Sequence, residues 1–465
     1  MNKNTQPPIP LTVTDNGGQS TQPESSQTVG NFLRQVESTN SSRFSHFTLQ
    51  CRSVYIHIPF CFHKCHYCDF YSIVDHKDRQ GLFIDRLIRE IHAYSDLQFP
   101  YQRSRTHSNR VVDSPQYGIP LINHDTPLRS IFIGGGTPTL LSVELWAVLL
   151  PVLHDIFNIT PSTEFTVEAN PETVTPELAH CLAEGGVNRI SIGAQSFNPI
   201  HLKTLERWHD PDHVSRSVEI IRQAGIDNYN LDLIFAIPGQ TMTDWQDDLD
   251  RAVNLKPTHL SCYTLTYEPG TALTARKNAG EFPPPDEDHE ADLFLATRTV
   301  LKEHDFDAYE ISNFALQDHS NQYQCRHNLA YWRSENWLAL GPAASGHLRP
   351  FRWKNVPHLQ HYLDQSPDGS GLPPIQDVEE ADPATQLAEQ MMMGLRLKEG
   401  IGYKELLVQA ESCGRAVEFE KAINRQIELG RMTKFNRGHQ SVALTTTKGI
   451  LLADTVISDL IDVIQ

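Results

Sequence analysis

Alternating strand-like and helix-like segments constrain the fold of this 465-residue chain most strongly. Six short segments between residues 54 and 264 are rich in β-branched and aromatic residues, as strands are. They are Val54–Ile58, Ser130–Ile133, Glu164–Glu168, Arg189–Gly193, Asn230–Phe235 and His259–Thr264. Between them lie amphipathic helical patterns, such as the apolar face of residues 83–94. Repeated strand–helix units predict a parallel sheet with helices outside it.

Local signals predict where some of these helices begin and end. Thr175 followed by a proline predicts a helix start, and Gly185 and Gly225 predict helix ends. Pro151 is expected to break the most apolar helix candidate, Trp146–Leu153. That candidate is also far too short to cross a bilayer.

Three cysteines crowd the loop after the first predicted strand, with the spacing Cys61-x3-Cys65-x2-Cys68. Thiolates suit iron–sulfur clusters and zinc alike. A structural zinc site commonly has four ligands in two separate pairs, so zinc would have to recruit a histidine of this loop or distant Cys51. Cubane clusters usually have four cysteine ligands, so three would leave one iron open. The spacing favours the cluster, with zinc as the alternative.

Unusual residues also follow the other predicted strands. Gly134-Gly-Gly-Thr-Pro138 follows the second strand, Glu168 ends the third and Gln195 follows the fourth. Asp232 lies within the fifth strand and Tyr263 near the end of the sixth. The carboxyl ends of the strands in a parallel barrel meet at one rim, so these groups should converge beside the cysteine loop.

The cysteine spacing together with the Gly-Gly-Gly-Thr-Pro run resembles the radical S-adenosylmethionine (SAM) superfamily. Within it, the run is similar to the branch of the oxygen-independent coproporphyrinogen III oxidases. Four further stretches are similar to the same branch, so the resemblance covers roughly residues 50–460: Tyr55–Cys61, Asp232–Gly239, Tyr309–Phe314 and Met393–Gly400. It implies an α/β fold, an open six-stranded parallel (β/α) barrel with a C-terminal winged-helix-like α+β domain.

The resemblance implies that Cys61, Cys65 and Cys68 hold a [4Fe–4S] cluster whose open iron is chelated by SAM. Carried over by position, it places around SAM the residues Tyr55, Tyr67, Gly135, Gly136, Thr137, Glu168, Gln195, Arg207 and Asp232. A carboxylate such as Glu168 can accept hydrogen bonds from the vicinal ribose hydroxyls. By residue type alone, Arg207 reads as an ordinary solvated helix residue.

Two groups within the branch differ at two markers. The oxidases carry a fourth cysteine two positions beyond the third, where this chain has Phe70. The HemW haem chaperones lack it and carry a His-Asn-x-x-Tyr-Trp motif, present here as His327, Asn328, Tyr331 and Trp332. The resemblance therefore implies a chaperone that binds a cluster, SAM and haem and delivers haem to an acceptor protein. The alternative is oxidative decarboxylation of porphyrin propionates.

The motif implies a haem site whose axial ligand is His327, because imidazole is a common ligand of haem iron and aromatic rings can cover a porphyrin. Cys325 is a competing thiolate ligand. Residue type alone favours a structural interpretation, in which His327 packs a loop and Tyr331 and Trp332 are core aromatics. No residue is assigned to catalysis, and the resemblance implies an electron donor and a haem-accepting protein without identifying them.

The amino-acid composition argues against some classes of function. A formal charge of −18, from 39 Lys and Arg against 57 Asp and Glu, argues against a nucleic-acid surface. Eight cysteines, five of them scattered, are unlike a secreted disulfide framework, and no signal peptide is evident. A cytoplasmic protein is expected.

The expected organisation has four parts. Residues 1–50 form a disordered polar extension, and residues 51–270 form the barrel with a flexible insertion at 99–128. Residues 271–380 carry the His-Asn-x-x-Tyr-Trp motif, and residues 381–465 form the C-terminal domain. In that domain, helices are predicted at Ala384–Leu397, Tyr403–Glu411 and Ala416–Leu429, followed by two strands. The mixed charges of the last helix give no basic footprint for DNA.

Overall fold

The computed structural model describes residues 27–32, 51–100, 118–120 and 125–464, apart from positions 285, 319, 365, 367 and 437. The extension expected at 1–50 lies outside these residues except for 27–32. Of the insertion expected at 99–128, residues 101–117 and 121–124 lie outside them. At its base, β2 (Gln98–Pro100) and β3 (Gly118–Pro120) pair as an antiparallel ribbon.

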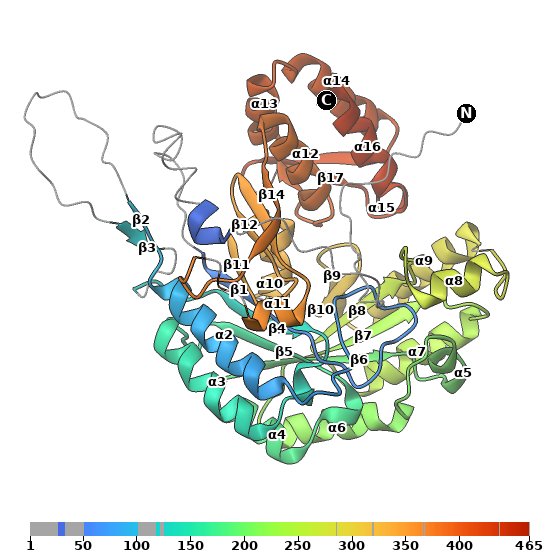
Figure 1. The fold of residues 1–465 in the computed structure, drawn as a ribbon. Helices are drawn as coiled ribbons and strands as arrows, with labels where there is room; N and C mark the ends of the chain where they lie inside the picture. The colour runs from blue at the N-terminus through green and yellow to red at the C-terminus, as the bar shows by residue number, and fades with distance from the viewer. Residues whose placement is uncertain are drawn as a thin grey trace, which may run out of the picture.

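Six parallel neighbours form the centre of one large sheet (Figure 1). In spatial order they are β1 (Ser53–Ile58), β4 (Ser130–Gly135), β5 (Glu164–Ala169), β6 (Arg189–Gln195), β7 (Tyr229–Phe235) and β8 (His259–Thr264). All six strands predicted from the sequence are present, and the spatial order follows the chain order. The carboxyl ends therefore share one edge, as the rim hypothesis requires.

Helices cover the convex side of these strands. They are α2 (Gln80–Ser95), α3 (Val143–Ile156), α4 (Pro176–Glu184), α6 (Pro211–Gln223), α7 (Met242–Asn254) and α9 (Glu287–Glu303). Shorter pieces are η2 (Pro138–Leu140), η3 (Pro171–Thr173), α5 (Pro199–Thr204) and α8 (Ala272–Asn278). Thr175 caps α4 by accepting a hydrogen bond from Leu178 N–H, and Gly185 is its C-cap, as predicted. Gly225, with φ +88°, follows the end of α6.

The predicted break at Pro151 is wrong, because α3 continues through it. Proline removes one backbone N–H, which costs about 3 kcal/mol in an exposed helix interior. Here Pro151 and Ala147, whose carbonyl loses its partner, both face solvent. The opposite face buries Trp146, Leu149 and Leu153, which stabilises the helix.

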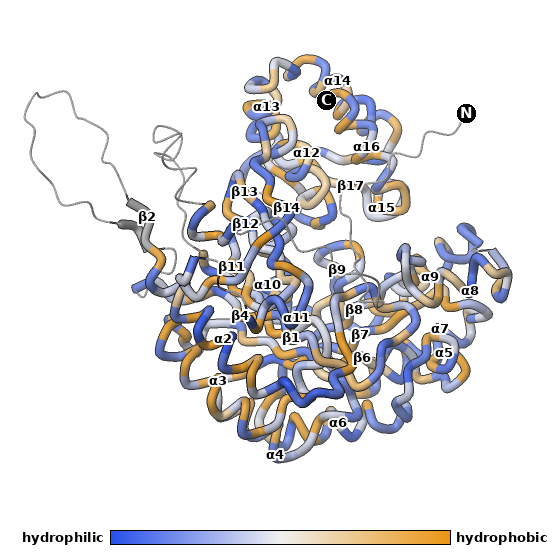
Figure 2. The backbone as a smooth tube through the Cα atoms, in the orientation of Figure 1, coloured by the Kyte–Doolittle hydropathy of each residue, from blue (hydrophilic) through white to orange (hydrophobic). Residues whose placement is uncertain are grey.

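Residues of the barrel strands alternate strictly between two environments. Outward-facing residues belong to the main apolar core, which Figure 2 shows as hydrophobic stretches along the strands and helices: Val54, Ile56, Ile131, Ile133, Phe165, Val167, Ile190, Ile192, Leu231 and Leu233. Inward-facing residues are mostly polar: Ser53, Tyr55, His57, Glu164, Thr166, Glu168, Arg189, Ser191, Asn230, Asp232, His259 and Ser261. Because successive side chains of a strand point to opposite faces, the concave face is a polar surface.

The chain after the barrel extends the sheet at both edges. β10 (Asn313–Leu316) pairs with β8, and β9 (Phe306–Ala308) pairs with β10. The chain then crosses through α10 (Arg326–Trp332) to the opposite edge, where β11 (Trp337–Leu340) pairs in parallel with β1. Beyond it lie β12 (Ser345–Leu348), β13 (Phe351–Asn355) and β14 (Ile375–Glu380), with α11 (Leu359–Asp364) between the last two. The helix with the His-Asn-x-x-Tyr-Trp motif therefore links the two sides of the open barrel.

Residues 27–32, which fall within the expected N-terminal extension, pack against this added sheet. Thr28 Oγ1 donates to Asp368 at 2.7 Å, and the Phe32 ring lies edge-on to Phe351 at 5.2 Å. Val29 is fully buried.

The C-terminal unit has its own core and a three-stranded sheet. Its elements are α12 (Pro383–Gly394), β15 (Ile401–Gly402), α13 (Tyr403–Ser412), α14 (Ala416–Glu428), β16 (Met432–Asn436), β17 (Gln440–Leu444), α15 (Lys448–Leu451) and α16 (Ala453–Ile464). The three predicted helices and two strands are present, whereas α15, α16 and β15 were not predicted. The order of α12 to β17 is that of a winged helix.

Candidate functional site

The cysteine loop follows β1 and is tied down at its base and its tip. The backbone N–H of Cys61 donates to Ile73 at 2.8 Å, and the backbone of His66 bonds to Leu205 at 3.3 Å and Leu273 at 2.8 Å. The three thiols of Cys61, Cys65 and Cys68 are free and half-buried. Within the described residues, no three His, Cys, Asp or Glu side chains are grouped as ligands of a single metal ion.

Two side chains from other elements reach the thiols. Thr137 Oγ1 lies 3.7 Å from Cys61 Sγ, and Arg207 Nη1 lies 3.7 Å from Cys65 Sγ. Burial, with the neighbouring cysteines, raises the pKa of Cys68 to about 12, and burial also raises the pKa of Cys61. Protein groups alone therefore do not ionise Cys61 and Cys68, and their thiolates would need a bound cation beside them. A cationic iron cluster fits this donor set.

Arg207 is not the solvated residue that its type suggests. It is half-buried, and its Nη2 donates to the Gly193 carbonyl at 2.8 Å. Burial alone would lower its pKa, but Tyr67 and Cys65 outweigh burial and raise it. A permanent positive charge therefore lies beside the cysteine loop.

The glycine run lies against the backbone that leads into the cysteine loop. Gly136 N–H donates to Ile58 and Thr137 N–H donates to Phe60, each at 2.7 Å. A Cβ on Gly136 would lie 2.6 Å from the Phe60 carbonyl oxygen, and Gly135 has φ +104°. The run is glycine-rich because two loops approach each other closely and one residue takes a left-handed conformation.

Two carboxylates face this rim from β5 and β7, the strands on either side of β6. Glu168 Oε2 accepts a hydrogen bond from Gly135 N–H at 3.0 Å, and its Oε1 has no partner among the described residues. Burial, and then the charge of Asp232, raises the pKa of Glu168 to about 7. Asp232 accepts from Ser191 Oγ at 3.0 Å and Asn230 Nδ2 at 2.8 Å, and burial raises its pKa. The pair can accept hydrogen bonds from a polar ligand or attract a cationic one.

The remaining predicted SAM residues lie at two depths. Gln195 has φ +64° at a bulge in β6, and its Nε2 would lie 2.9 Å from a Cβ on Gly193, beside Arg207. Tyr67 packs on the apolar group around Leu205. Tyr55 lies deeper, with its hydroxyl 3.1 Å from His57 Nδ1. The structure thus gathers the rim residues and leaves Tyr55 one layer below them.

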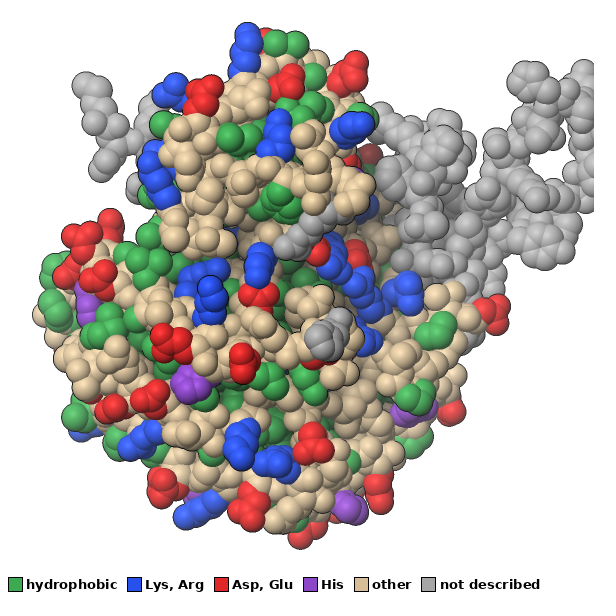
Figure 3. Space-filling view, turned by 180° about the vertical axis from the view of Figure 1, so that it is seen from behind, with side chains coloured by type: hydrophobic (Ala, Val, Ile, Leu, Met, Phe, Trp, Pro, Cys, Tyr) green, Lys and Arg blue, Asp and Glu red, His purple; other side chains and the backbone are tan. Residues whose placement is uncertain are grey.

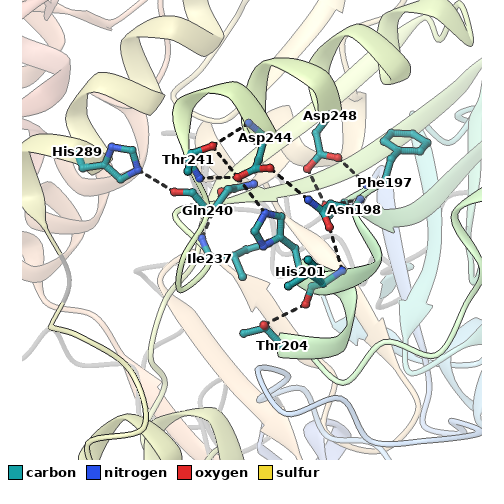
Figure 4. Close-up of polar contacts among 12 residues, drawn as sticks. Phe197, Asn198, His201, Thr204, Ile237, Gln240, Thr241, Asp244, Asp248 and His289 are labelled. Carbon is teal, nitrogen blue, oxygen red and sulfur yellow. Dashed lines mark hydrogen bonds and ion pairs between the residues drawn. The ribbon is translucent and has the colours of Figure 1, made fainter.

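A second polar cluster supports the rim from behind, between α5 and α7 (Figure 4). Asp248 accepts hydrogen bonds from Ser196 Oγ at 2.7 Å and from Phe197 N–H at 2.6 Å. Asn198 Nδ2 donates to Asp244 at 3.3 Å. These carboxylates fix the loop after β6, from which α5 leads directly to Arg207. The cluster therefore helps to orient the cation beside the cysteines.

The motif helix α10 points its histidine into the barrel. His327 is 1% exposed, with Nδ1 3.0 Å from Ser130 Oγ and Nε2 2.8 Å from Tyr331 Oη. Its ring stacks on Phe132 at 5.2 Å, and burial, with the charge of Arg189, lowers its pKa to about 3. Both ring nitrogens are engaged, so iron ligation by His327 would require its ring to leave two hydrogen bonds.

The other proposed haem residues do not share that face. Cys325 is fully buried, with Sγ 3.5 Å from Glu164 Oε1, and burial raises its pKa to about 12. Arg396 lies over the Trp332 ring at 5.5 Å, and Asn328 is half-buried. His327 and Tyr331 thus face the barrel, whereas Trp332 faces the C-terminal unit.

Sequence reasoning missed the polar interior between α10 and the rim. Glu164 accepts hydrogen bonds from the backbone N–H groups of Arg326 and His327 at 2.8 and 3.1 Å. Arg189 is 2% exposed and faces Glu164. His259 Nε2 lies 3.0 Å from Tyr309 Oη. The signal was present in the strict polar–apolar alternation of the strands.

Comparisons with known proteins agree with this geometry. Residues 55–252 match the model of the radical SAM superfamily. The heme chaperone HemW of Lactococcus lactis is 33% identical over 87% of this chain and 96% of that protein. HemW of Bacillus subtilis is 32% identical over 87% of this chain and 98% of that protein.

The chain belongs to the HemW group of the radical SAM superfamily. Coproporphyrinogen III oxidase (HemN) from Escherichia coli has the same fold, with a TM-score of 0.72 and 19% identity over 92% of both chains. The predicted family and fold class are therefore confirmed, and radical SAM membership implies a [4Fe–4S] cluster and SAM. Within the described part of this HemW-group chain, no helix is long and apolar enough to cross a membrane.

Proposed function

We propose that this chain is a haem chaperone, which binds haem and passes it to an acceptor protein. The observation that carries the proposal is the match of 32–33% identity over nearly the whole length of relatives named heme chaperone HemW. A cytoplasmic location, an electron donor and a haem-accepting protein are part of the same proposal.

In this proposal Cys61, Cys65 and Cys68 hold the cluster through their thiolates. When bound, a cluster of this kind would pass one electron from an external donor to SAM, which would divide into methionine and a 5′-deoxyadenosyl radical. Arg207 offsets the negative charge of the thiolates, since it lies 3.7 Å from Cys65 Sγ. Thr137 donates to Cys61, which favours the thiolate over the thiol.

For SAM, the proposal assigns hydrogen-bond acceptance from the ribose to Glu168, whose Oε1 is free among the described residues. Gly135 and Gly136 let the backbone approach a ligand, and Gln195 and Asp232 supply polar groups at neighbouring strand ends. Tyr55 and Tyr67 complete the assignment, Tyr67 at the rim and Tyr55 below it. Haem contact by His327, Asn328, Tyr331 and Trp332 stays a prediction.

The second candidate is oxidation of coproporphyrinogen III, favoured by the likeness to the oxidase fold. Against it stands Phe70, which is 58% exposed where the oxidases carry a cysteine. We expect the chain not to restore anaerobic growth to a strain lacking both coproporphyrinogen oxidases. Robust rescue would make the oxidase the better assignment.

The chaperone proposal is tested with anaerobically reconstituted full-length protein. Added haem should give a Soret band distinct from that of free haem, at one haem per chain. Addition of apomyoglobin as a generic acceptor should then move the Soret band to that of the myoglobin. No saturable haem binding by the wild-type protein would overturn the proposal.

A further inference from the structure

The tip of the cysteine loop is held by the part of the chain that follows the last strand of the barrel. β1 lies between β11 and β4 in the sheet, and β8 lies between β7 and β10, so the first and last parallel strands are far apart (Figure 1). The loop after β1 nevertheless meets α8, which follows β8. The backbone carbonyl of His66, the residue after Cys65, accepts a hydrogen bond from Leu273 N–H at 2.8 Å. The two ends of the open barrel therefore come together at His66.

Arg276 of α8 makes a second contact with the same loop residue. Its Nη1 lies 3.2 Å from His66 Nδ1 and 2.9 Å from the Thr204 carbonyl oxygen at the end of α5. Its Nε and Nη2 donate to the Glu281 carboxylate at 2.9 Å and 2.6 Å. A guanidinium only donates hydrogen bonds, so Nδ1 of His66 accepts in this contact. We call these four residues the loop clamp, because one planar group joins the cysteine loop, α5 and the segment after α8.

The same segments pack on one another beside the loop clamp. Leu205 and Leu273 belong to one small buried cluster, and Tyr67 of the cysteine loop packs against it. Phe282 also packs against this cluster, and the guanidinium of Arg276 lies 4.7 Å from its ring centroid. The loop clamp therefore lies at a packed junction of three segments.

A simpler interpretation is an ordinary surface ion pair between Arg276 and Glu281, whose side chains are 24% and 49% exposed. Exposed ion pairs generally contribute little to stability. Figure 3 shows acidic and basic side chains interspersed on the face of the protein seen from behind. The loop clamp differs from such a pair because the same guanidinium also bonds to a backbone carbonyl and to a side chain within the cysteine loop.

The loop clamp joins the two segments that meet at Cys65. α5 leads to Arg207, whose Nη1 lies 3.7 Å from Cys65 Sγ. The backbone N–H of His66 donates to the Leu205 carbonyl at 3.3 Å, which is a long hydrogen bond. The contact between Arg207 and the sulfur depends on the placement of both segments. A group that fixes both segments therefore also fixes the surroundings of this thiol.

We infer that Arg276 is a positioning residue for the cluster, which holds Cys65 and Arg207 beside each other through His66 and Thr204. The inference rests on the proposed function, in which the three loop cysteines hold the cluster. It names a residue outside the cysteine and glycine motifs. Every contact of the loop clamp is made by the protein alone, so Arg276 acts on the loop before a cluster is bound.

The first experiment uses cluster-free, full-length protein and therefore tests the loop clamp by itself. Hydrogen exchange measured by mass spectrometry compares a peptide that contains residues 61–68 with a strand peptide that contains residues 131–133. Arg276→Gln should speed exchange in the loop peptide about tenfold and leave the strand peptide unchanged, because the loop opens without unfolding of the barrel. Arg276→Lys should have a similar effect, since an ammonium group lacks the planar fork of donors.

The matched control is Lys277→Gln. It removes the same charge from the next position of α8, where Lys277 Nζ lies over the Tyr267 ring at 4.2 Å and takes no part in the loop clamp. Its loop peptide should exchange at the wild-type rate.

Variants of His66 test the acceptor. His66→Asn keeps an oxygen close to the position of Nδ1 and should exchange as wild type does. His66→Leu removes the acceptor and should speed exchange in the loop peptide. The double variant His66→Leu/Arg276→Gln should exchange no faster than Arg276→Gln alone, because both substitutions remove the same contact.

Anaerobically reconstituted protein supplies a readout that a merely structural role would not change. Bathophenanthroline disulfonate should remove iron from Arg276→Gln about tenfold faster than from wild type. The EPR signal of the reduced cluster should also change in shape, because Arg207 is no longer fixed beside Cys65. Lys277→Gln should match wild type in both measurements.

The outcomes separate this inference from the cluster assignment on which it rests. A wild-type protein that binds no cluster would overturn both. Wild-type exchange in the loop peptide of Arg276→Gln, or unchanged iron loss and EPR signal, would overturn the role of Arg276 alone. Equal effects in Lys277→Gln would mean that only charge matters, and faster exchange in the strand peptide as well would mean that Arg276 stabilises the whole barrel. Either result also overturns the positioning role.

Discussion

The two ends of this barrel are built in different ways. At the carboxyl end, the cysteine loop and the glycine run are each continuous in sequence, and their backbones bond directly through Thr137 N–H and Phe60. At the amino end, a cavity of about 530 Å³ is lined by single side chains from positions as distant as Arg129 and Lys398. Continuous loops leave motifs in a sequence, whereas a surface assembled from separate segments leaves none.

The two ends also differ in the charged side chains that they carry and in how these are paired. At the rim, burial and then the charge of Asp232 raise the pKa of Glu168, and burial raises the pKa of the Cys61 and Cys68 thiols. Such a site is completed when cations bind. At the amino-end cavity, three basic side chains are already paired with carboxylates: Arg129 with Glu335, Arg333 with Glu399 and Lys398 with Asp307. The rim therefore keeps groups that a bound cation would complete, whereas the charges at the amino end are largely paired within the protein.

The largest expected effect tests the rim. Replacing Cys61, Cys65 and Cys68 together with alanine should abolish iron binding and the EPR signal of the reduced cluster, because no thiolate ligand remains in the loop. Cys181→Ala, a half-buried cysteine outside the loop, should keep both. Four tightly bound irons in the triple variant, or stoichiometric zinc in the anaerobic wild type, would contradict the cluster assignment.

Close loop contact should make Gly136 sensitive to substitution. Gly136→Ala places a Cβ 2.6 Å from the Phe60 carbonyl oxygen, so we expect a loss of about 1–3 kcal/mol in the free energy of unfolding. Iron retention should fall with it, because the displaced backbone leads into Cys61. Gly81→Ala, in α2 with nothing within 4 Å, is the matched control and should be neutral or slightly stabilising. Equal effects would mean that the contact is easily relieved.

Glu168 tests the ligand-binding part of the rim. Glu168→Ala should weaken SAM binding by about 1–3 kcal/mol, the cost of leaving buried hydroxyls without an acceptor. Calorimetry on the cluster-containing protein measures it. Glu172→Ala, which removes an exposed partner of His213, should leave the affinity unchanged. An unchanged affinity in Glu168→Ala would make this carboxylate structural.

The smallest expected effects have opposite pH dependence at the two ends. Glu168 has its pKa raised from 4.5 to about 7, so its contribution to stability is full below pH 4.5 and is lost as pH rises through 7. His327 has its pKa lowered from 6.5 to about 3, so its contribution is full above pH 6.5 and is lost as pH falls toward 3. Glu168→Gln and His327→Asn should each remove the corresponding slope.

Urea unfolding of cluster-free protein between pH 3 and pH 8 measures both slopes as differences from wild type. Each variant should lose a pH-dependent part of its free energy of unfolding, and the two slopes should have opposite signs. A slope of the same sign in both variants would contradict the opposite environments of the two ends.

The barrel could be predicted from the sequence because each strand has its own local pattern of residues. Val54–Ile58 and its five counterparts are short, β-branched and followed by helical periodicity, so local pattern and final structure agree. The rim could be predicted from these strands, since the carboxyl ends of parallel strands lie at one edge of the sheet. Arg207 was the exception. Its position depends on the loop held by Asp248, through contacts between residues 51 and 52 positions apart in the chain.

The interior and the cavity could not be predicted in the same way. His327 was identified from its motif, but its role depends on Ser130, 197 residues earlier in the chain. Pro151 was misjudged because burial of the opposite helix face outweighs the local cost of proline. Propensity is local and packing is not, so errors are expected where distant segments meet.

The pairing of β1 with β11 has a consequence for biosynthesis. Ser53 meets Trp337 in this ladder, so one edge of the first strand waits for a partner 284 residues later in the chain. At a synthesis rate of about 5–20 residues per second, the delay is roughly 15–60 s. During that time the strand that carries the cysteine loop has an open edge, which is a template for wrong pairing. Newly made chains should therefore need protection in the interval before the ribosome reaches residue 340, and cluster loading should follow release rather than accompany translation.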